Sequence, residues 1–90
     1  MNDEEFLYTC PSAVFFDNSI TFDELKIYMM AYSIMDVSGD VYASSAWLAE
    51  RLSLDQLHVI DCVYKLISKG YVKIVSMNDR KGIRVIQTRS

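Results

Sequence analysis

Apolar residues recur with a helical period in three stretches of the chain, and they alternate with polar residues in its last twenty positions. The first helical stretch runs from Phe22 to about Val37. Thr21 and Glu24 occupy the positions of a capping box at its start, and the turn sequence around Gly39 ends it. Its polar stripe is narrow, so we expect this helix to be buried on more than one side.

A short second helix is predicted after an extended piece at residues 41–43. Either Ser44 or Ser45 is expected to cap it, because a serine hydroxyl accepts hydrogen bonds from the first free amides of a helix. The helical pattern then continues to Leu52.

The third helix is expected to follow almost at once, from Leu54 to about Lys69. Ser53 and Gln56 stand in the positions of a second capping box, and Gly70 offers a left-handed helix end. The second and third helices would then be joined by a tight turn, as in a helix-turn-helix.

The period becomes strand-like after Gly70. Residues 71–77 form one predicted strand, residues 78–82 a polar turn, and residues 83–88 a return strand, which gives a hairpin with a basic tip. The element order predicts an α+β fold of the winged helix-turn-helix type over residues 21–90. It has three helices, a C-terminal β-hairpin wing, and a short strand between helices one and two.

Residues 1–20 have no comparable periodicity, and Pro11 interrupts them. We expect them to form an N-terminal extended segment that packs on the core of the domain. The chain stops soon after the hairpin, so a piece of a longer protein is a further possibility.

The composition is that of one small folded domain: 90 residues, 51% of them hydrophobic. The first residues are acidic, unlike a signal peptide, and no apolar run is long enough for a membrane span. We therefore expect a cytoplasmic protein that has no contact with membranes. Cys10, Cys62 and His58 have no metal-binding spacing, so the cysteines are expected to be reduced packing thiols, and no metal or cofactor is expected.

Charge is divided unevenly along the chain. Residues 1–50 carry a net charge of −8, whereas residues 51–90 carry +5, although the whole chain is only −3. Two interpretations remain open. The charges balance within one domain, or the C-terminal half presents a basic face that binds a polyanion.

Several core positions fit a known pattern, which consists of Tyr42-Ala43-Ser44, Trp47-Leu48-Ala49-Glu50, Leu52, Val59, Val63, Leu66 and Lys69-Gly70-Tyr71-Val72. Over residues 14–75 the chain resembles the winged helix-turn-helix domains of phage and plasmid replication organisers and related bacterial DNA-binding regulators. This resemblance implies binding of duplex DNA with the third helix in the major groove, and a role in transcription or replication control without catalysis.

The expected DNA contacts lie on the second and third helices and on the hairpin. Gln56 is suited to bond an adenine, and the hairpin bases are suited to phosphates. The full set is Ser44, Ser45, Gln56, His58, Lys65, Lys69, Lys73, Arg80, Lys81 and Arg84. Asp55 and Asp61 depart from the family, because carboxylates near the third helix repel phosphates.

The apolar surface of the third helix is also wider than the core would cover on one side of the helix. The first helix has a similarly wide apolar surface. Either the N-terminal segment and the hairpin cover the extra positions, or they form a homodimer or partner interface. The candidates are Leu57, Ile60, Tyr64, Ile67, Tyr28, Met29 and Tyr32. The alternative function is therefore an interaction module that does not bind DNA.

No arrangement of residues indicates catalysis. His58 lacks a nucleophile at a recognisable spacing, and all three glycines stand at element ends rather than in a phosphate-binding loop. We expect neither an enzyme nor a small-molecule substrate.

Overall fold

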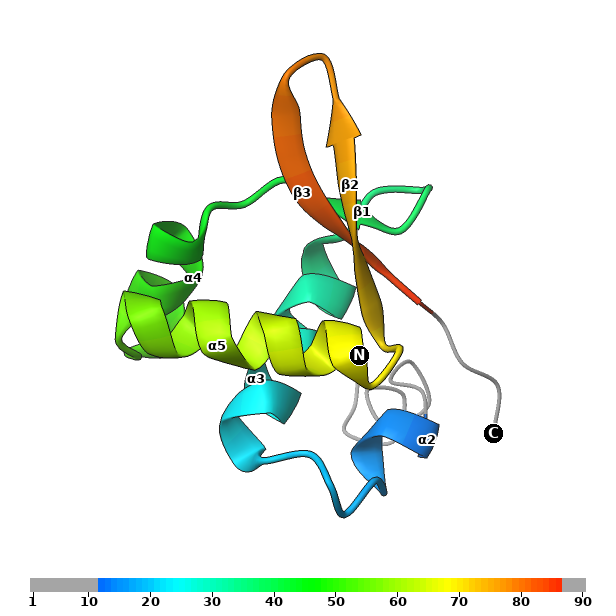
Figure 1. The fold of residues 1–90 in the computed structure, drawn as a ribbon, viewed down its shortest axis with the longest axis vertical. Helices are drawn as coiled ribbons and strands as arrows, with labels where there is room; N and C mark the ends of the chain where they lie inside the picture. The colour runs from blue at the N-terminus through cyan, green and yellow to red at the C-terminus, as the bar shows by residue number, and fades with distance from the viewer. Residues whose placement is uncertain (1–11, 87–90) are drawn as a thin grey trace.

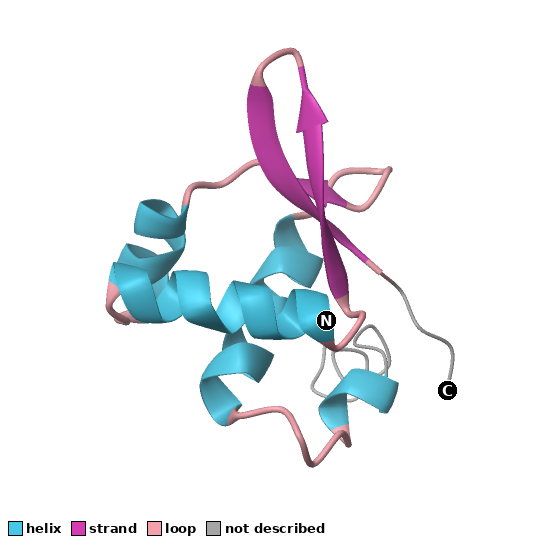
Figure 2. Ribbon diagram, viewed as in Figure 1, coloured by secondary structure: helices cyan, strands magenta, loops and turns pink. Residues whose placement is uncertain are grey.

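Three helices pack against one another beside a three-stranded antiparallel sheet, and the hairpin of that sheet projects away from them (Figures 1 and 2). A computed structural model describes residues 12–86, and this part of the chain is a small α+β domain. Its elements are α2 (Ser12–Phe15), α3 (Phe22–Ile34), β1 (Asp40–Val41), α4 (Ser45–Leu52), α5 (Gln56–Ser68), β2 (Val72–Met77) and β3 (Arg80–Val85). Helix α5 packs against α3, α4 and β2.

Strand β3 lies in the middle of the sheet, between β1 and β2. The register pairs Val72 with Val85 and Ile74 with Ile83. Because neighbouring residues of a strand point to opposite sides, this register gives the hairpin two faces. The inner face, toward the helices, carries Val72, Ile74, Ser76, Lys81, Ile83 and Val85. The outer face carries Lys73, Val75, Met77, Arg80, Gly82 and Arg84.

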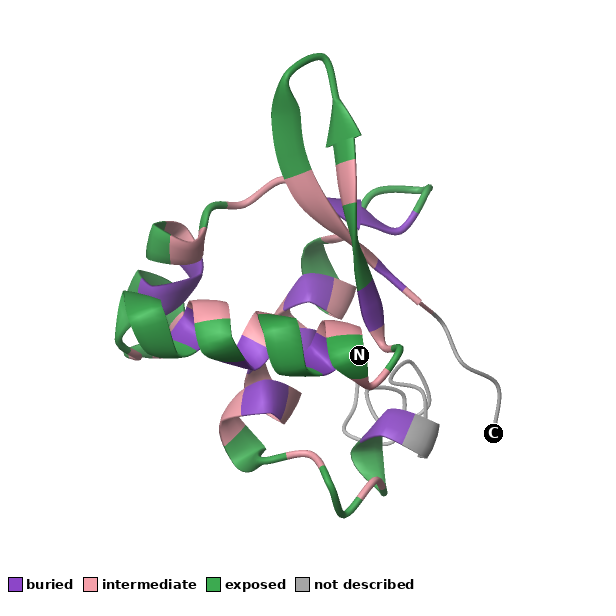
Figure 3. Ribbon diagram, in the orientation of Figure 1, coloured by how far each residue is buried: buried purple, intermediate pink, exposed green. Residues whose placement is uncertain are grey.

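The core forms where α3, α4 and α5 meet the base of the sheet (Figure 3). Tyr28 and Ile27 of α3 are fully buried, and the Tyr28 hydroxyl donates to the carbonyl of Ile86 at 3.1 Å. The buried apolar residues are Val14, Ile27, Tyr28, Ala31, Val41, Leu48, Ala49, Val59, Cys62, Leu66, Val72 and Val85.

Helix α3 begins as predicted but ends early. The Thr21 hydroxyl accepts from the amide of Glu24, which confirms the cap. The helix ends at Ile34 rather than near Val37, because Met35 takes an extended backbone conformation with ψ of 150°. A turn follows in which the Asp36 carboxylate accepts hydrogen bonds from the amides of Ser38 and Asp40.

The turn between α4 and α5 does not contain the capping box that was predicted for Ser53 and Gln56. Ser44 caps α4, as one of the two alternatives had it, and its hydroxyl accepts from the amide of Trp47. Ser53 does not begin α5. It ends α4 in the left-handed conformation, with φ of 56°. The cap of α5 is Asp55, whose carboxylate accepts from the first-turn amides, so α5 starts at Gln56 rather than at residue 54.

The hairpin turn is shorter than predicted. Asn78 and Asp79 both have positive φ, 49° and 65°, which is the geometry of a two-residue type I′ turn. The prediction of a basic tip is therefore wrong: Arg80 and Lys81 belong to β3, and the tip carries Asn78 and Asp79. Gly70 takes the predicted left-handed conformation before β2, with φ of 84°.

The N-terminal segment is only partly described. Ser12–Phe15 form one helical turn, so the prediction of an extended segment is wrong there, and Val14 lies in the core. Predictions for residues 1–11, Cys10 among them, and for residues 87–90 lie outside the described residues. None of the helices in residues 12–86 is long and apolar enough to cross a membrane.

Candidate functional site

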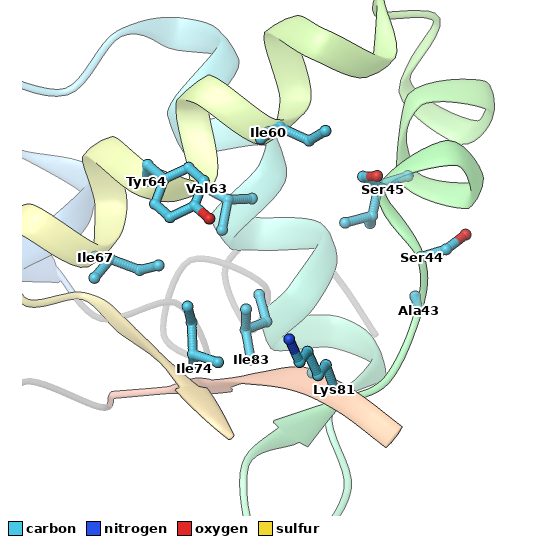
Figure 4. Close-up of a pocket in the computed structure, with 12 residues that line it drawn as sticks. Ala43, Ser44, Ser45, Ile60, Val63, Tyr64, Ile67, Ile74, Lys81 and Ile83 are labelled. Carbon is cyan, nitrogen blue, oxygen red and sulfur yellow. The ribbon is translucent and has the colours of Figure 1, made fainter. Parts of the chain in front are cut away.

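A groove lies where the start of α4, one side of α5 and the inner face of the hairpin meet (Figure 4). Its volume is about 260 Å³. The lining is mainly apolar, and its apolar side chains are Ala43, Leu48, Ile60, Val63, Tyr64, Ile67, Ile74 and Ile83. The groove can therefore accept an apolar group without leaving buried polar atoms unpaired.

Polar groups reach this groove from three elements. Ser44 and Ser45 line it at the start of α4, and Lys81 lines it from β3. At the start of α5, the Gln56 amide Nε2 donates to the Ser45 hydroxyl at 3.1 Å. Four of the predicted DNA contacts are thus brought together around one groove.

The hairpin separates the cations that were expected to act together. Lys81 lies on the inner face and borders the groove, whereas Lys73, Arg80 and Arg84 lie on the outer face. The expectation that Arg80, Lys81 and Arg84 hold one stretch of phosphate backbone needs correction, because alternation along β3 turns Lys81 away from the other two.

Arg84 is bound to a buried carboxylate. Its Nε and Nη2 donate to the two carboxylate oxygens of Asp40 at 2.6 and 3.1 Å, and the Asp40 side chain is almost fully buried. The Arg84 hydrogen bond lowers the pKa of Asp40, and the same bond raises that of Arg84. The pair fastens β1 to β3, which gives Arg84 a structural role, and its contact with a phosphate stays a prediction.

Lys69 is likewise part of the fold. Its Nζ donates to Glu24 Oε1 and to the carbonyl of Ser19, both at 2.7 Å. The Glu24 side chain is 2% exposed and that of Lys69 only 25%. Its charge neutralises a buried carboxylate, so Lys69 has a structural role, and its contact with DNA stays a prediction.

The remaining basic candidates of α5 also have acidic neighbours. His58 Nε2 lies 2.8 Å from Asp23 Oδ2 at the start of α3, and Lys65 Nζ lies 3.1 Å from Asp61 Oδ2 one turn earlier in α5. The hydrogen bond to Asp61 raises the pKa of Lys65. Neither residue lines the groove, so α5 presents little uncompensated positive charge to it.

The predicted interface residues divide between groove and core. Ile60, Tyr64 and Ile67 line the groove, and Leu57 is exposed one turn earlier on α5. Tyr28 is completely buried, so its assignment to an interface is wrong. Met29 and Tyr32 are half-buried on α3, where Tyr32 stacks on the Tyr28 ring, and they contribute nothing to the groove.

Two side-chain clusters, one on the sheet and one near the start of α3, had no signal in the sequence. The Tyr42 ring lies against Gly82, and the Arg80 guanidinium carbon lies 4.8 Å from the centre of that ring. Farther away, Asp17 accepts hydrogen bonds from Ser19 and from the Tyr71 hydroxyl, which lower the pKa of Asp17 to about 2. Both clusters depend on pairings across the fold.

No protein-family model matches this chain, and a comparison with curated proteins finds no significant similarity. The geometry of the groove and of the sheet therefore carries the functional argument alone.

Proposed function

We propose that the chain is a winged helix-turn-helix domain that binds duplex DNA. The element order α3, β1, α4, α5, β2, β3 supports this assignment, as does the pairing of β1 with β3 of the hairpin. Helix α5 follows α4 through a short turn and leaves one side exposed, as the second helix of a helix-turn-helix does when it enters a major groove.

The observation that carries the proposal is the set of polar groups around the groove. Ser44, Ser45, Gln56 and Lys81 come from three elements and gather on the same side of the domain. A duplex lying across this side would meet hydroxyl groups and an ammonium group suited to phosphates. It would also meet an amide suited to an adenine edge.

The apolar side chains of α5 have a role in the same complex. Leu57 and Tyr64 are 76% and 60% exposed on the side that would enter the major groove. The methyl group of thymine is the apolar feature of that groove, so these side chains favour sites rich in thymine. Base reading would then rest more on apolar contact than on charged hydrogen bonds.

Charge reversal at Lys81 tests this orientation. Lys81→Glu should weaken binding to a fluorescein-labelled duplex by about tenfold at low salt, since it replaces a phosphate contact by repulsion. The matched control is Lys26→Glu, which makes the same charge change on α3, an element that does not border the groove. An equal loss in both variants would show diffuse attraction and refute the orientation.

A second function, docking of a protein or of a second copy, is favoured by the apolar lining of the groove. Ile74 of the hairpin and Tyr64 of α5 both line the groove and are 56% and 60% exposed, so part of its apolar lining is open to a partner. This function predicts self-association in analytical ultracentrifugation that Ile60→Lys and Tyr64→Lys abolish. Such a result, together with no duplex binding at low salt, would replace the DNA proposal.

A further inference from the structure

The outer face of the sheet combines cations with a stacked aromatic ring. Lys73 stands directly opposite Arg84, and Arg80 lies four residues from Arg84 along β3. At the rise of an extended strand this separation is about 13 Å. Cations therefore stand near both ends of the outer face.

Tyr42 occupies the middle of this face because residue 82 is a glycine. A Cβ atom there would lie 2.7 Å from Tyr42 Cδ1 and 2.4 Å from the carbonyl oxygen of Val41. Without it, the ring lies directly against β3, and the Arg80 guanidinium stacks over it at 4.8 Å. One face of the Arg80 guanidinium packs on the Tyr42 ring. The other face is open to solvent, since Arg80 is exposed.

Two acidic groups near this face, Asp40 and Asp36, are already bonded, whereas Asp79 stands at the hairpin tip beside Arg80. Arg84 neutralises Asp40, and the Tyr42 hydroxyl donates to the second oxygen of that carboxylate at 3.5 Å. The Asp36 carboxylate accepts from backbone amides of its own turn. Lys73 and Arg80 form no ion pair with any residue in 12–86, so both charges remain available to a ligand.

We propose that the outer face of the sheet binds an extended single strand of nucleic acid. Lys73 and Arg80 would contact two phosphates of the same strand, and an unpaired base would stack on the open plane of the Arg80 guanidinium. Flat sheets with cations and planar side chains suit single strands, because every base offers a π face and every linkage a phosphate. The positive charges of Lys73 and Arg80 thus favour a strand that carries phosphates over a protein surface that carries few acidic groups.

This surface is distinct from the groove proposed to bind a duplex, because the two lie on opposite faces of the hairpin. Arg80 and Lys81 are neighbours in β3 and point to opposite sides. If one of the two binding proposals fails, the other is therefore unaffected. Charge reversal at Lys81 tests the duplex site, and charge reversal at Arg80 tests the single-strand site.

The test is fluorescence anisotropy with a labelled oligothymidylate of about twelve nucleotides, at low salt, on the full chain. Lys73→Glu and Arg80→Glu should each weaken binding about tenfold, whereas Lys81→Glu should change it by less than about threefold. Arg80→Lys, which keeps the charge and removes the plane, should give an intermediate loss. An oligouridylate of the same length shows whether DNA or RNA is preferred, and binding of either supports the proposal.

Three results would overturn it. They are no binding of either oligonucleotide at about 20 mM salt, an equal loss in Lys81→Glu and Lys73→Glu, and full affinity in Arg80→Glu. Circular dichroism checks that each variant is folded. If Lys73→Glu or Arg80→Glu does not fold, Lys73→Gln or Arg80→Gln takes its place in the binding measurement. Loss of duplex binding with oligothymidylate binding retained would count against the groove proposal alone.

Discussion

Among the basic residues in 12–86, Lys69 separates a structural role from a DNA-binding role most sharply. Its ammonium group donates to Glu24 Oε1 and to the carbonyl of Ser19, and the Glu24 side chain is 2% exposed. Lys69→Met keeps most of the aliphatic stem and removes the charge. The variant leaves a buried carboxylate without its ammonium partner.

The expected cost follows from the burial of the two side chains. Breaking a fully buried ion pair by removing one partner costs about 3–5 kcal/mol. The Lys69 side chain is 25% exposed, so water partly replaces the lost ammonium and the cost falls to about 2–3 kcal/mol. For a domain of this size that lowers the melting temperature by about 10–20 °C.

The assay is thermal and urea unfolding followed by circular dichroism, with the affinity for duplex DNA measured where the variant is folded. Lys65→Met is the matched control, because its partner Asp61 is exposed and the pair is open to solvent, so its melting temperature should stay near that of the parent protein. In Lys69→Met the additional change Glu24→Gln should restore part of the stability, since it removes the buried charge.

The opposite pattern would refute the reasoning. If Lys69→Met melted within about 2 °C of the parent and lost affinity for DNA, the ammonium group would serve the ligand rather than Glu24.

Three further predictions concern the sheet, a surface carboxylate and the buried thiol. Gly82→Ala should destabilise the domain by about 1–3 kcal/mol, since Tyr42 and the β1 carbonyl must move, and an unchanged urea midpoint would contradict this. Hydrogen bonds, above all from the Ser19 hydroxyl, lower the pKa of Asp17 from 3.8 to about 2. The stability that they give should be complete above about pH 4 and be lost as the pH falls toward 2, and Asp17→Asn should remove this part of the acid transition. Burial raises the pKa of the Cys62 thiol, so in a variant whose other cysteine is serine it should react with Ellman's reagent only as fast as the domain unfolds.

Local signals in the sequence were sufficient for α3, α4 and α5 and for their order, but not for α2. Thr21 and Ser44 cap the helices they were expected to cap, and Gly70 ends the third helix. Ser53 misled the prediction because Asp55, two residues later, is an equally good cap. The sequence does not show that Ser53 must take the left-handed conformation that ends α4.

The candidate site depended on information that is not local. The number of residues in a hairpin turn sets the register of the two strands. The predicted turn, residues 78–82, was too long, so it placed Arg80 and Lys81 together at the tip. The two-residue turn instead places them on opposite faces of β3. The partners of Lys69 and Arg84 lie 45 and 44 residues away in the sequence, so only the fold reveals that these two cations are neutralised.

Titration of the parent protein with a labelled duplex of mixed sequence, at about 20 mM and about 150 mM salt, tests the central claim most directly. We expect binding at low salt that weakens with a slope of about −1 in a plot of log affinity against log salt concentration, as for the one ammonium group, that of Lys81, that the groove presents to a phosphate. Absence of binding at low salt, or an affinity that does not change with salt, would contradict it.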